Sequence, residues 1–141
     1  MITGAVGGGL CAVEALGILD SVAEDNAVFC VDPHLARVCA ALEGCCGEPR
    51  RWLAPRDVPH VALSLAIAAQ LADLDRQVIA LTGVAGGRSM LDNLPFLDEA
   101  QLPLKVVVLS PLDTAGDLVA RARASGAFAS APDTPAAVEA A

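Results

Sequence analysis

The segment at residues 76–88, RQVIALTGVAGGR, contains the pattern in this chain that is most typical of ligand binding. An apolar strand runs into a glycine-rich turn at residues 83–87, and a helical pattern follows from Ser89. Glycine lets the backbone approach a ligand closely, and the first N–H groups of a helix are free to bind an anion. The pattern therefore suggests a phosphate site. Its spacing is neither GxGxxG nor GxxxxGKS/T, so a turn that needs glycine only for its geometry stays open as the alternative.

Two histidines are the candidates for acid–base catalysis, because imidazole titrates near neutral pH. His60 precedes an apolar helical segment, and His34 follows a strand. For both, a solvated or backbone-capping role is the alternative. No GxSxG sequence surrounds Ser89 or Ser110, so we expect no nucleophilic triad.

The elements that must position these residues alternate along the chain. Apolar runs predict strands at residues 27–31, 51–54, 78–82, 105–109 and 128–130. Helical spacing predicts helices at residues 10–23, 33–44, 61–72, 89–100, 114–125 and 134–141, with Pro95 as a kink or a boundary. The alternation indicates an α/β fold with one domain over residues 1–141: a doubly wound, mostly parallel sheet of about five strands, with helices on both faces.

Ligands bind at the carboxyl ends of the strands in such a sheet, so the residues that follow the strands form the candidate site. They are Asp32 and His34 after the first strand, Asp57 and His60 after the second, residues 83–89 after the third, and Ser110 after the fourth.

Composition narrows the possible partners. The net charge of −8 repels phosphate backbones and anionic lipids, so we expect no nucleic acid and no membrane as a partner. The apolar start of the chain has no basic region and contains Glu14, which predicts no export signal and a cytoplasmic protein. Apolar residues make up 55% of the chain, and this favours a homo-oligomer that covers apolar surface. The five cysteines form no CxxC pair, so neither a disulfide framework nor a metal site is expected.

From about Asp25 onward, the order of features resembles the diphosphate-binding domain of thiamine-diphosphate enzymes. The resemblance is to the branch of 2-oxoacid decarboxylases, acetolactate synthase and sulfopyruvate or phosphonopyruvate decarboxylases. It is carried by AVFCVDPHLARVCAAL, by RRWLAPRDVPHVALSLAIAAQLA, by RQVIALTGVAGGRSMLDNL, and by LPLKVVVLS with the segment after it. The family's fold agrees with the α/β prediction above.

The resemblance implies a cofactor site that has degenerated. In the family, the Asp of a GDG triplet and a later Asn bind Mg²⁺, which bridges the cofactor diphosphate to the protein. Here the triplet is Gly83, Val84 and Ala85, and the later position falls near Ser110. Valine has no oxygen for a hard cation, so Mg²⁺ is not expected to bind through this chain alone. The resemblance also implies that thiamine diphosphate needs a partner chain that carries the pyrimidine-binding domain.

Three functions follow as expectations. The first is a stand-alone subunit of a thiamine-diphosphate-dependent lyase or transferase complex, with a structural or partner-dependent role and with residues 83–87, Asp32, Asp57, Ser89 and Ser110 at the inherited cofactor edge. The second is a metal-free enzyme that uses His60 or His34 on a small anionic or carbonyl substrate. The third is a binding module for a small phosphorylated molecule.

Overall fold

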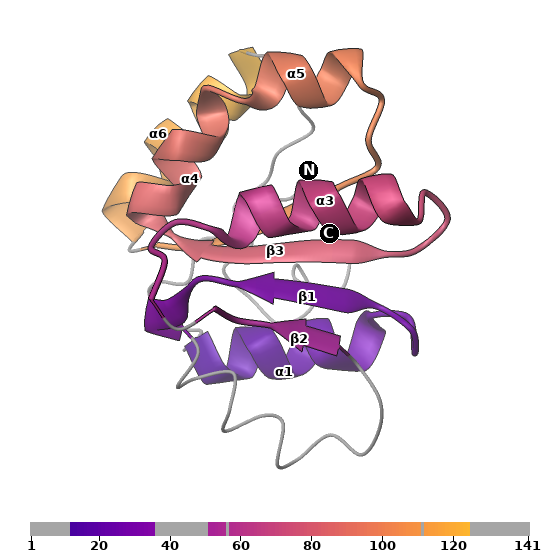
Figure 1. Ribbon diagram of the computed structural model, residues 1–141. Coiled ribbons are helices and arrows are strands. Elements are labelled where there is room, and N and C mark those ends of the chain that lie inside the picture. The colour runs from indigo at the N-terminus through magenta and orange to yellow at the C-terminus, as the bar shows by residue number, and fades with distance from the viewer. Residues whose placement is uncertain (1–11, 36–50, 56, 111, 125–141) are drawn as a thin grey trace.

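The computed structural model describes residues 12–35, 51–55, 57–110 and 112–124 (Figure 1). Its strands are β1 (Val28–Val31), β2 (Arg51–Leu53), β3 (Val78–Gly83) and β4 (Lys105–Leu109). Its helices are α1 (Ala12–Val22), the 3-10 turn η1 (Pro33–Leu35), α3 (Ala62–Ala72), α4 (Val84–Leu91), α5 (Leu94–Glu99) and α6 (Leu112–Ala124). Four predicted strands are confirmed to within one residue. The predicted strand at residues 128–130, the helix at 134–141 and most of the helix at 33–44 lie outside the described residues.

The described strands form one parallel sheet in the order β2-β1-β3-β4. The sheet has four strands rather than the predicted five, because the fifth falls on residues outside the described part. The chain passes from β1 to β2 on one side, whereas β3 is followed by β4 on the other side. The carboxyl ends of β1 and β3 therefore flank a switch point, where ligands bind in open α/β sheets.

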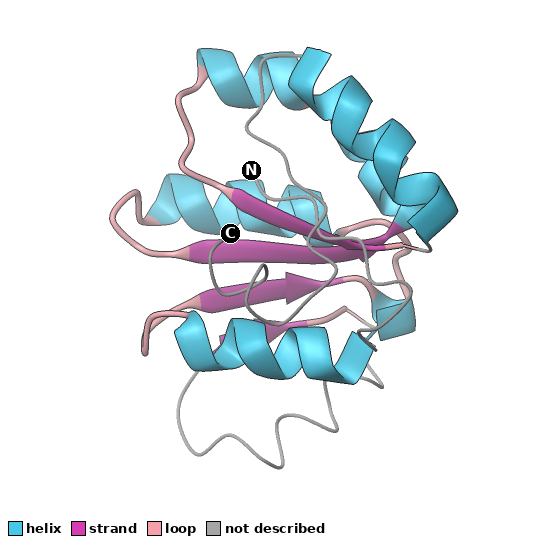
Figure 2. Ribbon diagram, turned by 180° about the vertical axis from the view of Figure 1, so that it is seen from behind, coloured by secondary structure: helices cyan, strands magenta, loops and turns pink. Residues whose placement is uncertain are grey.

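Helices cover both faces of this sheet (Figure 2). On β1, Val28 and Cys30 point to one face, whereas Phe29 and Val31 point to the other. The first face packs against α3, α4, α5 and α6, and the second packs against α1. The Phe29 ring also stacks on Trp52 of β2, with centroids 4.5 Å apart. Burial on both faces explains why the strands are continuously apolar rather than alternating.

The glycine-rich segment differs from its prediction. The structure has a helix there instead of a turn, because α4 begins at Val84, directly after β3. Gly86 and Gly87 therefore lie inside the helix, and both are buried. The predicted helix at residues 89–100 is two helices, α4 and α5, with Pro95 in the first turn of α5. Pro95 is thus a boundary residue, since proline is favoured at the first positions of a helix.

A buried glutamine fixes the loop that connects α3 to β3. The Gln70 side chain is fully buried, and its Nε2 donates to the carbonyl oxygens of Asp73, Leu74 and Arg76 at 2.9–3.2 Å. These carbonyl groups lie in the turn that follows the helix, where the Asp73 carbonyl also accepts from the Arg76 N–H, so Gln70 adds a side-chain donor to this turn. None of the helices in the described part of the chain has the length and apolar character that a bilayer crossing requires.

Candidate functional site

Asp32 is the central polar residue at the carboxyl edge of the sheet. It follows β1 and is fully buried. Its Oδ1 accepts a hydrogen bond from the Ala62 N–H at 3.0 Å, and its Oδ2 accepts one from the Thr82 hydroxyl. Val61, at the start of α3, makes no side-chain cap, so Asp32 supplies the cap from 30 residues away. Its negative charge also complements the positive end of the α3 dipole.

Three glycines at this edge are close to internal neighbours. A Cβ on Gly86 would lie 2.8 Å from Asp32 Oδ2 and would overlap the Thr82 hydroxyl. A Cβ on Gly87 would lie 2.8 Å from Cγ1 of Val108. Any side chain larger than the hydrogen of glycine at these two positions would push α4 away from β3 and β4. The glycines therefore allow α4 to pack closely on the sheet. This packing explains the glycines without a bound phosphate.

His34 lies beside the third glycine. A Cβ on Gly83 would lie 2.6 Å from His34 Nε2, so the imidazole covers the point where β3 passes into α4. The His34 side chain is exposed. Gly83 is the N-cap residue of α4, and no side chain caps this end of the helix. The first N–H groups of α4 can therefore donate to an anion.

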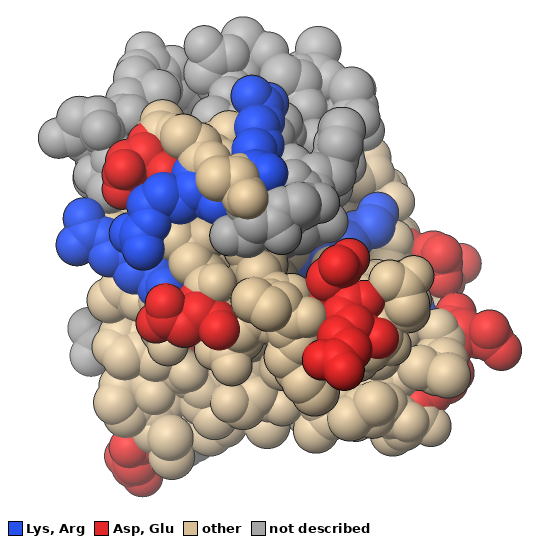
Figure 3. Space-filling view, turned by 90° about the horizontal axis from the view of Figure 1, so that it is seen from above, with Lys and Arg blue, Asp and Glu red and all other residues tan. Residues whose placement is uncertain are grey.

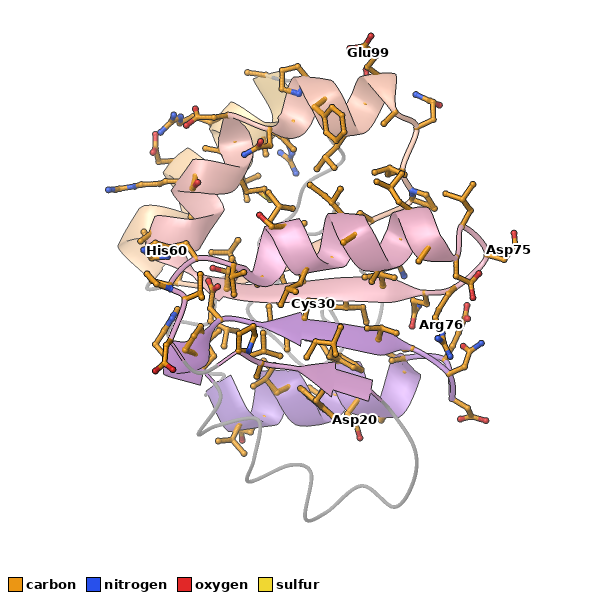
Figure 4. All side chains as sticks on the ribbon, in the orientation of Figure 1. Asp20, Cys30, His60, Asp75, Arg76 and Glu99 are labelled. Carbon is orange, nitrogen blue, oxygen red and sulfur yellow. The ribbon has the colours of Figure 1, made fainter. Side chains whose placement is uncertain are left out.

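His60 and Asp57 lie in the segment that leads into α3, and both are exposed. His60 has a φ of 54°, a left-handed conformation that is uncommon for residues other than glycine. Figure 4 shows His60 beside the start of α3, at the end of the sheet where the strands finish. The described structure thus brings Asp32, His34 and Gly83 together. Asp57 and His60 lie in the segment between β2 and α3, and His60 lies at the same end of the sheet.

The two positions that the family resemblance assigns to metal ligands lie side by side. Gly83 pairs with Leu109 in the β3–β4 ladder, so Val84 and Ser110 each follow a paired residue at the same edge. Val84 is half-buried, and Ser110 is 3% exposed. Ala85 and Ser89, also on α4, are exposed.

This pair does not fit a magnesium diphosphate. The side chain at position 84 has no oxygen, and the Asp32 carboxylate, which lies beside Gly86 of α4, already accepts two hydrogen bonds inside the protein. Among the described residues, no group of three or more His, Cys, Asp or Glu is placed to hold a metal ion.

Charge near the site is unevenly distributed. Arg88 lies on α4, and Arg121 and Arg123 lie in the last turn of α6, which contacts α4. Figure 3 looks down on these helices and shows most of the described Lys and Arg side chains toward one side, with a broad uncharged area elsewhere. Because α6 begins just after β4, its last turn with Arg121 and Arg123 lies away from the carboxyl edge. A phosphorylated ligand at the start of α4 would therefore have Arg88 as the only basic residue of that helix.

Cys30 is buried beneath α3 on β1, and burial raises the pKa of its thiol to about 12. A thiol with that pKa is neutral and unreactive at physiological pH. Cys30 thus packs as a small buried apolar residue, whereas Cys11, Cys39, Cys45 and Cys46 lie outside the described residues.

Thr82 is the site residue that sequence reasoning missed. It is the only hydroxyl residue in the apolar strand VIALTG, and it points to the same face as Asp32. A polar residue at the last positions of a buried strand was the available signal, because buried hydroxyl groups need a partner.

No protein-family model matches the chain, and no curated protein matches it.

Proposed function

We propose that this chain is a stand-alone subunit of a complex related to thiamine-diphosphate-dependent 2-oxoacid decarboxylases or carboligases. Its own metal position no longer holds Mg²⁺, so its contribution is structural or depends on a partner chain. The observation that supports this most is the pairing of β3 with β4, which sets Val84 and Ser110 side by side at the carboxyl edge. A shared metal would need this placement, yet valine offers no ligand atom.

The internal role of Asp32 supports a structural contribution. A carboxylate that binds a cation or a substrate must present an oxygen outside the protein, but Asp32 is fully buried and joins β1, β3 and α3. The glycines support the same view, since their missing side chains make room for Thr82, Val108 and His34. The polar groups of the edge thus stabilise the domain.

Isothermal titration tests the loss of the metal site. The full chain is titrated with thiamine diphosphate in the presence of Mg²⁺, and we expect a dissociation constant weaker than about 1 mM, which corresponds to a binding free energy of about −4 kcal/mol. Submicromolar binding by the chain alone would overturn the proposal, because the cofactor would then need neither Asp at position 84 nor a partner.

Coexpression tests the subunit role separately. The chain is coexpressed with the product of the adjacent reading frame, and we expect a stable complex in which that product supplies a pyrimidine-binding domain with its Glu. If the adjacent product has no such domain, or if the two chains elute separately, the subunit role is wrong even where the titration result holds.

A second candidate function rests on His34. Its exposed imidazole lies against Gly83, at a helix start without a side-chain cap, which favours a metal-free site for a small anionic or carbonyl compound. Titration with pyruvate and with inorganic phosphate, followed by NMR, tests it. Shifts of the Gly83 and Val84 amide signals that disappear in His34→Ala support this function, and unchanged spectra exclude it.

A further inference from the structure

We draw no further inference here: the strongest candidate, the buried side-chain oxygen Oε1 of Gln70 on α3, which accepts no hydrogen bond within the described part of the chain, is enclosed by protein, and nothing in the structure shows a ligand or a partner that reaches it.

Discussion

Asp32 and Thr82 are hydrogen-bonded across the carboxyl ends of β1 and β3, although 50 residues separate them in the chain. The same carboxylate accepts the first free N–H of α3. One buried residue therefore connects two strands and a helix at the edge where α/β proteins bind ligands. Both oxygens of this carboxylate are used in hydrogen bonds that stabilise the fold, so we expect Asp32 to have a structural role at this edge.

Replacing Thr82 by valine should lower the free energy of unfolding by about 2–3 kcal/mol. The shape is kept, but a buried carboxylate oxygen loses its donor, and hydrogen bonds to charged groups contribute more than neutral ones. Thr82→Ser keeps the hydroxyl and should lose much less. Urea denaturation measures both variants, and an equal loss in the two would show that the methyl group, not the hydrogen bond, matters here.

The glycines of α4 and α6 should respond to alanine in opposite directions. Gly86→Ala places a Cβ against Thr82 and Asp32, so we expect a loss of about 1–3 kcal/mol from overpacking. Gly116→Ala, in α6, meets nothing within 4 Å and should gain up to about 1 kcal/mol from helix propensity. Thermal unfolding of the two variants checks the signs. A gain at Gly86 would contradict the close packing of α4 on the sheet.

A carboxylate oxygen at position 84 should allow the carboxyl edge of the sheet to bind a divalent cation. Val84→Asp puts a carboxylate at the first residue of α4, beside Ser110, and Asp is well tolerated at that position because of the helix dipole. We expect at least about tenfold tighter Mn²⁺ binding than in the wild type, a difference of about 1.4 kcal/mol.

The matched control for this gain is Ala85→Asp, which adds the same charge at the next, exposed residue. Paramagnetic broadening of the Gly83 and Ser110 amide signals locates the ion in each variant. Equal broadening in both variants would show that the added charge alone attracts the ion. No broadening in either variant would contradict the proposal that Val84 and Ser110 occupy a former metal site.

Stability should fall in alkaline solution partly because of Cys30. Burial raises its pKa in the folded protein to about 12, from an ordinary thiol value of 9.0, so between these values the folded state holds a proton that the unfolded state releases. The contribution of Cys30 to the free energy of unfolding is fully present below pH 9. Above pH 9 this contribution decreases by at most about 1.4 kcal/mol per pH unit.

Cys30→Ala removes that dependence. Denaturation at several pH values from neutral to alkaline compares the two proteins, and the variant should show the flatter curve above pH 9. Iodoacetamide labelling adds a kinetic readout, because the buried Cys30 should react only on unfolding, as mass spectrometry of its peptide reports. Rapid labelling of Cys30 in the folded protein would contradict its burial.

The strands were the most predictable part of the fold. Runs such as KVVVL and VIALT are β-branched and short, and their identity depends on neighbours only a few residues away. The glycine segment was less predictable, because glycine is common in turns and rare in helices. Gly86 and Gly87 are helical since α4 packs so closely on β3 and β4 that a larger residue would not fit, and that contact is not local in sequence.

The sequence by itself determined the α/β class, the positions of the four described strands and the absence of an anionic oxygen in the side chain at position 84. The tertiary structure decided the strand order β2-β1-β3-β4, the alignment of Val84 with Ser110 and the engagement of Asp32 by Thr82 and Ala62. The physical reason is range: backbone propensity and apolar periodicity act over a few residues, whereas these contacts join segments 26–50 residues apart, which only the packed sheet brings together.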